Sequence, residues 1–218
     1  MNDNSTYFRN SRAELLAFLP KKYSRVLEIG CGEGHFRGNL KPGNEYWGVE
    51  LIDSAAAVAS TRLDRVLTGS FLDVCDQIPN GYFDLVICND VIEHMPDHDQ
   101  FLQIIKTKMR EDGCLMGSLP NVRYLPNLLS LLMQKDWRYA DAGILDRTHL
   151  RFFTERSIVR TFRENGYVIE GLSGITHAYR TGSILKRCLY GLVLLIVGRD
   201  AGFLQFGFRI RQTGQPHT

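Results

Sequence analysis

Several residues that could bind a ligand follow short apolar segments of the sequence. Gly30, Gly32 and Gly34 are spaced G-x-G-x-G directly after the apolar run RVLEIG. Glycines at this spacing allow a sharp turn and a close approach of the backbone to a ligand. Glu28 would place a carboxylate beside that turn, where it repels a pyrophosphate and attracts an ammonium or sulfonium group. Glu50 lies at the end of a second apolar run, EYWGVEL, where an acidic side chain can bind a ribose diol.

The residues around the glycine turn restrict what it could hold. A Walker-type phosphate loop needs G-K-[ST], which this sequence lacks. The dinucleotide fingerprint needs a glycine where this chain has His35, so a nicotinamide-dependent oxidoreductase is disfavoured. Ser70 and Phe71 follow a third apolar segment and could flank an adenine, and Asn89 follows a fourth. Together these positions predict a ligand with an adenosine and a cationic amino-acid end but without phosphate.

Short apolar segments alternate with amphipathic ones, which predicts an α/β domain with a mainly parallel sheet. Strands are expected at residues 25–30, 45–51, 64–70, 83–89, 114–120, 167–172 and 203–212. Helices are expected to begin at cap residues: Ser11 in the capping box Ser11-x-x-Glu14, Asp53 or Ser54, Asp97 or Asp99, and Thr154. The third of these helices has an apolar stripe that reaches Met109, and Gly113 would stop it. Asn165-Gly166 would end the fourth.

The composition favours one soluble domain. The chain has 218 residues, 44% of them hydrophobic and 23% charged, with a net charge of +2 and scattered basic residues, so no nucleic-acid partner is expected. Five widely spaced cysteines without a C-x-x-C pair, and a polar N-terminus unlike a signal peptide, favour a cytoplasmic protein with reduced thiols. A single domain, 1–218, is expected to comprise an N-terminal helix (1–22), a cofactor-binding core (23–120), an inserted lid (121–154) and a C-terminal part (155–218).

Two segments stand outside this regular alternation. Residues 121–150 are too long for a plain connection, and RYLPNLLSLLMQKDW within them predicts an inserted helix that forms a lid or a substrate wall. The apolar run CLYGLVLLIVG, 188–198, falls short of the roughly 20 residues that a spanning helix needs. A buried helix is the simplest interpretation. The alternatives are a peripheral contact of residues 183–199 with the inner face of a membrane or with a glycosyltransferase.

The motifs LEIGCGEG, GVEL, FDLVICNDVIEHMPD and GCLMGSLPN resemble, in order and spacing, the S-adenosylmethionine-dependent methyltransferases of the Rossmann-like class. The resemblance covers roughly residues 7–172. It implies a doubly wound, seven-stranded sheet with the last strand antiparallel, and S-adenosylmethionine as the methyl donor. Many members carry Asp where this chain has Ser70. The cofactor-binding residues carried over are Glu28, Gly30, Cys31, Gly32, Gly34, Glu50, Leu51, Ser70, Phe71 and Asn89.

Methyl transfer to a hydroxyl would gain from a general base, for which histidine is suited near neutral pH. His149, in the lid segment LDRTHLRFF, is the leading catalytic candidate, with Asp146 placed to orient its imidazole. His94, in DVIEHMPD, is a second candidate, although a role in shaping the cofactor site is favoured. The rival interpretation of LDRTHLRFF is a brace, in which Asp146 pairs with Arg147 or Arg151. No metal ion is expected, because no ligand cluster has convincing spacing.

Two finer resemblances concern the acceptor. Thr148-His149-x-x-Phe152-x-Thr154 is similar to a segment of the ubiquinone-biosynthesis O-methyltransferases. YF-x-x-S-R-x-E-L-L, GSLPNVRY and LDRTHLRFFT resemble bacterial methyltransferases associated with glycosyltransferases and polysaccharide assembly.

The second resemblance implies a saccharide hydroxyl, on a nucleotide sugar, a lipid-linked glycan or a polysaccharide end, as the acceptor. One alternative acceptor is a phenol or quinone precursor, methylated on O or N. Another alternative is that the protein is a catalytically silent S-adenosylmethionine-binding partner. The protein is expected to be a monomer or a dimer. The expected substrate-binding residues are Asn121, Tyr124, Asp146, Arg147 and Arg151.

Overall fold

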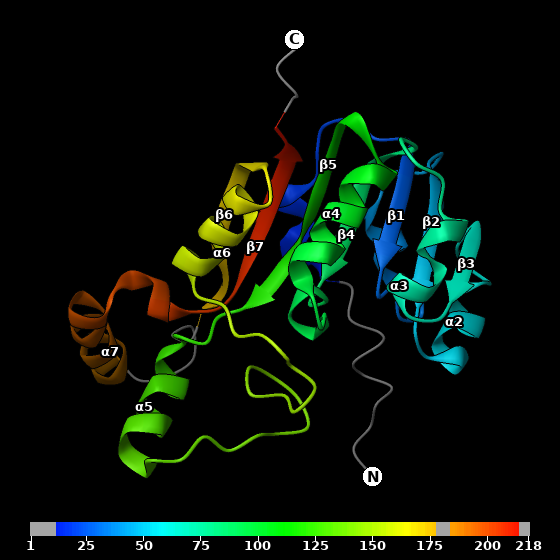
Figure 1. The fold of residues 1–218 in the computed structure, drawn as a ribbon. Helices are drawn as coiled ribbons and strands as arrows, with labels where there is room; N and C mark the ends of the chain where they lie inside the picture. Colours follow the sequence, from blue (N-terminus) through cyan, green and yellow to red (C-terminus); the bar gives the residue numbers. More distant parts are fainter. Residues whose placement is uncertain (1–11, 178–183, 214–218) are drawn as a thin grey trace.

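The computed structural model describes residues 12–177 and 184–213, with only the backbone described for 184–189. Its centre is a seven-stranded sheet with the order β3-β2-β1-β4-β5-β7-β6 (Figure 1). β7 pairs antiparallel with β5 and β6, whereas the pairs among β1 to β5 are parallel, as predicted. The strands are β1 (Arg25–Ile29), β2 (Glu45–Glu50), β3 (Arg65–Thr68), β4 (Phe83–Asn89), β5 (Met109–Pro120), β6 (Tyr167–His177) and β7 (Phe203–Gln212).

Helices cover both faces of the sheet, so the predicted doubly wound fold is confirmed. Leu27 of β1 belongs to a buried cluster with Phe101 of α4 and Phe162 of α6. On the other face, Val26 packs in a second cluster with Leu15. β1 and β4 are therefore apolar on both sides, as buried parallel strands are. The α-helices are α2 (Asp53–Ala59), α3 (Phe71–Val74), α4 (His98–Lys108), α5 (Leu125–Gln134), α6 (Glu155–Glu164) and α7 (Ile184–Val197).

Two helix starts agree with the predicted caps. The Asp97 side chain accepts a hydrogen bond from Gln100 N at the start of α4. Thr154 forms a capping box with Ser157 at the start of α6, and Gly166 follows that helix with a φ of 68°. These caps satisfy backbone N–H groups that have no partner within the helix.

Other helix boundaries differ from the prediction. α4 ends at Lys108, and residues 109–113 already belong to β5, because Met109 is buried and pairs with Phe83. Gly113 thus lies inside a strand and does not stop the helix. α2 begins at Asp53 without a side-chain cap.

Short 3₁₀ helices lie in the connections between the strands and α-helices. They are η1 (Ala13–Phe18), η2 (His35–Asn39), η3 (Cys75–Gln77), η4 (Ile92–His94) and η5 (Arg199–Gly202). η1 stands where a capped helix was expected, and Ser11 of the expected capping box lies outside the described residues.

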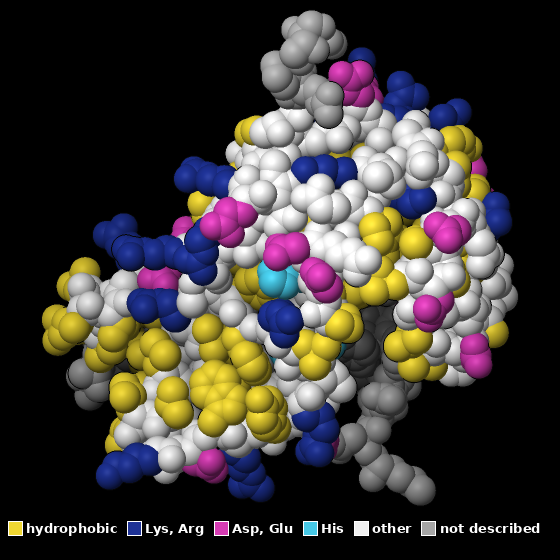
Figure 2. Space-filling model, in the orientation of Figure 1, with side chains coloured by type: hydrophobic (Ala, Val, Ile, Leu, Met, Phe, Trp, Pro, Cys, Tyr) yellow, Lys and Arg dark blue, Asp and Glu magenta, His cyan; other side chains and the backbone are white. Residues whose placement is uncertain are grey.

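The predicted lid, residues 121–154, contains the expected helix as α5 and continues as an irregular loop below the sheet (Figure 1). α7 lies beside α5 in this part of the molecule (Figure 1). Arg123, just before α5, donates from Nη2 to Val197 O at the end of α7, and its Nε pairs with Asp200 at 2.6 Å. Apolar side chains gather on this part of the surface (Figure 2). In the part of the chain that the structure describes, no helix is long and apolar enough to cross a membrane.

Candidate functional site

The glycine loop lies between the carboxyl end of β1 and η2. Gly30, Gly32 and Gly34 have φ angles of 69°, 53° and 77°, a region that residues with a Cβ rarely adopt. A Cβ on Gly30 would also lie 2.8 Å from a methyl of Val91. Gly30 N donates to Val49 O at 2.8 Å, which holds the turn against the end of β2. The backbone of this loop can therefore be approached closely by a ligand, because no side chain at Gly30, Gly32 or Gly34 stands in the way.

Glu50 fixes this loop from the neighbouring strand. Its side chain is buried, and Oε2 accepts from Gly32 N at 2.7 Å while Oε1 accepts from Ile52 N at 2.9 Å. Each carboxylate oxygen keeps further acceptor capacity. Leu51 beside it is 64% exposed, which leaves an open apolar surface at this edge of the sheet.

Glu28 lies deeper than the sequence suggested. Its side chain is buried on the sheet face that carries Tyr46, whose hydroxyl donates to Glu28 Oε2 at 2.7 Å. Burial raises the pKa of Glu28 to about 8, an effect that the Tyr46 bond opposes and the nearby Glu50 charge reinforces. The carboxyl group thus holds a proton over much of the neutral range unless a cation approaches it.

The other predicted cofactor residues occupy different environments. Ser70 caps α3, where its hydroxyl donates to Asp73 Oδ2 at 2.6 Å. Phe71 is buried in the core, edge-to-face with Phe101 at 5.1 Å, which does not favour its role as an adenine platform. Asn89 ends β4, and its Oδ1 is buried without a hydrogen-bond partner. Cys31 is buried, and burial raises the pKa of its thiol, so it is not a nucleophile.

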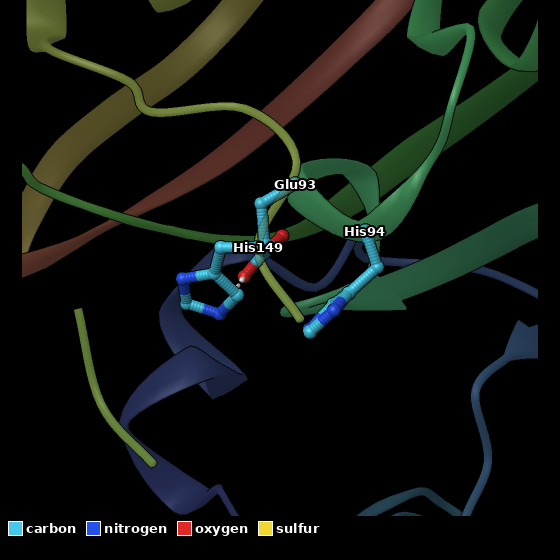
Figure 3. A group of neighbouring side chains, drawn as sticks. All are labelled: Glu93, His94 and His149. Atoms are coloured by element: carbon cyan, nitrogen blue, oxygen red, sulfur yellow. Dashed lines mark ion pairs between the residues drawn. The ribbon is translucent and has the colours of Figure 1, made fainter. Parts of the chain in front are cut away.

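The two candidate histidines meet at this edge although they are far apart in sequence. The rings of His94 and His149 lie 4.7 Å apart at 73° (Figure 3). His94 comes from the turn after β4 and His149 from the lid. Burial, and then the neighbouring His149, lower the pKa of His94. A lowered pKa favours the neutral form of the His94 imidazole, which is the form that can accept a proton.

Each ring is held by a backbone carbonyl. His94 Nδ1 lies 3.1 Å from Thr148 O, and His149 Nδ1 lies 3.0 Å from Ile144 O. Because a carbonyl oxygen only accepts, the proton is assigned to Nδ1 in both rings and each Nε2 keeps its lone pair. The Asp146 carboxylate accepts from Thr148 N and Oγ1, whereas His149 Nδ1 pairs with Ile144 O, so any influence of Asp146 on His149 is through its charge rather than through a hydrogen bond.

Glu93 completes this group and was not among the site residues predicted from the sequence. Its Oε1 lies 4.0 Å from His149 Nε2, and neither carboxylate oxygen has a hydrogen-bond partner. Burial raises the pKa of Glu93 well above its usual range, and the charge of Asp90 adds to this. The signal was present in VIEH, where Glu93 precedes a candidate catalytic histidine.

The segment LDRTHLRFF also braces the lid, with partners other than those expected. Glu93 O accepts from Leu150 N and Arg151 N at 2.9 and 3.1 Å. The Arg151 guanidinium donates to Pro96 O at 2.8 Å. Arg147 pairs with Asp141, not Asp146, at 2.8 Å on the surface. The brace is thus formed mainly with the backbone of the turn after β4.

The remaining two predicted substrate residues lie at the start of the lid. Asn121 is fully buried, and its Nδ2 donates to Asp200 O and Phe203 O at 2.8 and 2.9 Å. These bonds tie the lid to β7, so a substrate contact would have to break them. Tyr124 is partly exposed, and burial raises the pKa of its hydroxyl.

A polar network that the sequence did not predict joins three strand ends. Arg12 forms an ion pair with Asp90 and donates to Ser118 Oγ at 3.0 Å and to Gln205 Oε1 at 3.1 Å. Ser118 and Gln205 in turn donate to Asp90 Oδ1. No local pattern reveals this network, because its members come from four distant segments.

The sheet is doubly wound, and its first loop is rich in glycine. Acidic residues lie near the ends of β1 and β2, and the loop lacks a phosphate-binding lysine. These features define a Rossmann-like enzyme for an adenosine cofactor. The chain matches the methyltransferase-domain family over residues 4–171 and belongs to it. It is an S-adenosylmethionine-dependent methyltransferase.

The sequence relatives include enzymes that act on small molecules. The chain is 26% identical over 163 residues to a ubiquinone biosynthesis O-methyltransferase of Aeromonas salmonicida, covering 71% of this chain and 67% of the relative. It is 27% identical over 124 residues to a trans-aconitate 2-methyltransferase of Deinococcus radiodurans, covering 54% of this chain and 48% of the relative.

Solved structures share the fold. A methyltransferase from Archaeoglobus fulgidus has a TM-score of 0.68 at 17% identity, covering 96% of this chain and 95% of that chain. A didemethyltoxoflavin N-methyltransferase from Burkholderia thailandensis, with bound S-adenosylhomocysteine, has a TM-score of 0.61 at 19% identity, covering 97% of this chain and 81% of that one.

Proposed function

We propose that the enzyme methylates a hydroxyl group of a small organic acceptor of the phenol or quinone-precursor class. The observation that carries the proposal is the His94–His149 pair, whose Nε2 lone pairs lie where the lid meets the turn after β4. A phenolic hydroxyl is a weak nucleophile until a base takes its proton. The ubiquinone-biosynthesis and trans-aconitate relatives support small-molecule O-methylation over the saccharide acceptor expected from the polysaccharide-associated resemblance.

In the proposed reaction, the acceptor oxygen attacks the methyl carbon of S-adenosylmethionine in line with the sulfur–carbon bond. That bond breaks, S-adenosylhomocysteine leaves, and His149 Nε2 takes the hydroxyl proton, with His94 as the alternative base. The glycine loop and Glu28 would contact the methionine part of the cofactor, and Glu50 and Leu51 the ribose. Alignment of the two reactants and exclusion of water account for most of the catalysis.

A saccharide hydroxyl is the second candidate acceptor. It is supported by LDRTHLRFFT, in which Arg147 is 64% exposed and could bind hydroxyl or phosphate groups of a glycan. Labelled methyl transfer to a panel of catechols and hydroxyquinones, run beside nucleotide sugars and glycan extracts, distinguishes the two classes. Transfer to sugars alone would overturn the first proposal. Cofactor binding without transfer to either panel would favour the silent binding protein.

The catalytic assignment is tested by His149→Ala and Glu50→Ala. We expect His149→Ala to lose most turnover while its affinity for S-adenosylhomocysteine, measured by calorimetry, stays within a fewfold. Glu50→Ala should mainly weaken the cofactor, because the carboxylate both accepts from Gly32 N and is proposed to hold the ribose. Asp76→Asn, on the exposed surface, is the control. Near wild-type turnover of His149→Ala would exclude it as the base.

We further propose that α7 makes a peripheral contact with an anionic membrane surface on the cytoplasmic side. Leu192, Leu195 and Ile196 are 61%, 72% and 83% exposed on this helix, and the exposed Arg199 follows it. Co-sedimentation with phosphatidylglycerol vesicles should fall when Leu195 and Ile196 are replaced by Ser. Binding only to a glycosyltransferase, or self-association measured by light scattering, would contradict a membrane contact.

A further inference from the structure

Three potential metal ligands converge beside the lid, outside the predicted cofactor residues. Glu93, His94 and His149 each offer one ligand atom, and these atoms all lie within 4.8 Å of one another. Figure 3 shows the Glu93 carboxyl group directed at His149, with the His94 ring beside them. The convergence depends on the fold, because 55 residues separate the lid histidine from His94.

The imidazole rings of His94 and His149 are each oriented by a hydrogen bond at Nδ1. Both Nδ1 atoms are engaged by backbone carbonyls, Thr148 O for His94 and Ile144 O for His149. A metal-binding histidine commonly donates from its other ring nitrogen in this way, which fixes the ring orientation and leaves the remaining nitrogen as a ligand. Nε2 of each ring is therefore the atom available to an ion.

The carboxylate is the second and independent observation. Glu93 is 0% exposed, yet both of its side-chain oxygens lack a hydrogen-bond partner. Buried polar atoms are nearly always paired, and an unpaired buried carboxylate is costly. The carboxylate oxygens of the nearby Asp90 are not unpaired in this way, because Arg12, Ser118 and Gln205 donate to them. The unpartnered group is aimed at the two imidazoles, and a cation there would satisfy it.

We propose that Glu93, His94 and His149 bind one divalent transition-metal ion of the Zn²⁺ class and thereby clamp the lid to the turn after β4. Two imidazoles and one carboxylate suit Zn²⁺ or Co²⁺, whereas Mg²⁺ prefers oxygen ligands. Ligands of a tetrahedral Zn²⁺ are about 3.4 Å apart at bond lengths near 2.1 Å. The 4.0 Å between Glu93 Oε1 and His149 Nε2 would have to shorten by about 0.6 Å, and the widest separation in the group, up to 4.8 Å, by up to about 1.4 Å, through side-chain rotation on metal binding.

The metal site itself goes beyond the proposed reaction, and only its expected effect on turnover rests on the proposed base. An ion would take the same Nε2 lone pairs that the proposed base uses, so we expect Zn²⁺ to inhibit methyl transfer. It would also cross-link the lid to the sheet, adding to the backbone bonds from Leu150 and Arg151 to Glu93 O.

The test is Co²⁺ and Zn²⁺ titration of the chelator-treated protein. We expect one equivalent of Co²⁺ with the visible spectrum of a tetrahedral nitrogen- and oxygen-bound ion, displaced by Zn²⁺. His149→Ala, His94→Ala and Glu93→Gln should each weaken binding by about 100-fold or more. His98→Ala is the matched control, because His98 pairs with Asp99 at the start of α4 and not with this group. Each variant is first checked for folding by circular dichroism and thermal denaturation in chelator.

Limited proteolysis provides a readout that is independent of activity. Zn²⁺ should slow cleavage in the exposed loop 135–143 of the wild-type protein and of His98→Ala, but not of His149→Ala. Absence of stoichiometric binding, or equal binding by the three ligand variants, would overturn the metal site. Failure of the proposed methylation in chelator would leave these measurements unaffected, so the two proposals fail separately.

Discussion

At the scale of single residues, the two acidic side chains that end β1 and β2 have opposite environments. Glu50 accepts two backbone N–H groups, which stabilise a carboxylate. Glu28 has one neutral donor, the Tyr46 hydroxyl, and is otherwise surrounded by buried groups. Glu28 is therefore the residue whose charge should respond most to the arrival of a cationic cofactor.

Glu28 should make the stability of the unliganded protein fall with rising pH. Its pKa is raised from 4.5 to about 8 by burial, so its protonated form favours folding. This contribution is complete below pH 4.5 and is lost as the pH rises to about 8. The resulting change in the free energy of unfolding is on the order of a few kcal/mol, since a shift of one pKa unit corresponds to about 1.4 kcal/mol. Glu28→Gln should make the fall of stability shallower, measured by urea denaturation from pH 5 to 9, while the contribution of Glu93, whose pKa is also raised by burial, remains.

Tyr46→Phe is the companion variant. It removes the bond that lowers the pKa of Glu28, so the loss of stability should extend to higher pH. Parallel stability curves for wild type and Glu28→Gln would contradict the assignment.

At the scale of elements, the sequence predicted the strands, because each is a short apolar run bounded by turn residues. It failed where pairing with another strand decides the boundary, as at Met109, which joins β5 because it pairs with Phe83. It also missed Glu93: VIEH places this residue beside a candidate catalytic histidine, but nothing local shows that His149, from far along the chain, will face it. The sequence did predict Gly30 and Glu50 as site residues, because each lies in a recognisable local motif at the end of a strand.

The glycine loop allows a prediction with a matched control. Gly30 and Gly43 both have positive φ, at 69° and 89°, but a Cβ would meet Val91 at 2.8 Å only at Gly30. Gly43→Ala should cost about 1 kcal/mol, from backbone strain alone. Gly30→Ala should cost about 1–3 kcal/mol more, because overpacking adds to the strain. Thermal denaturation measures the difference, and equal losses would contradict close packing at Gly30.

At the scale of the whole molecule, Arg12 links the N-terminal part of the described chain to β4, β5 and β7. Its side chain is 14% exposed and that of Asp90 is 16% exposed, so the ion pair is largely shielded from solvent. The network crosses the same edge of the sheet as the glycine loop. It therefore couples Arg12, at the start of η1, to the position of the turn that carries Glu93 and His94.

Arg12→Met should destabilise the protein by about 3 kcal/mol, because it leaves the Asp90 carboxylate without its cation. Asp90→Asn in the same chain should recover part of that loss, because Asn carries no charge. Urea denaturation of the four proteins completes a double-mutant cycle. Strictly additive losses would show that the pair does not stabilise the fold.

β7 is the last of the described strands in sequence order, yet it lies between β5 and β6 in the sheet. During synthesis, β5 and β6 therefore leave the ribosome with facing edges that have no strand between them. An unpaired edge invites pairing with other chains, and it stays open until residues 203–212 emerge. Translation pauses after α6, or chaperones that shield strand edges, should thus influence the yield of this enzyme more than its compact first half suggests.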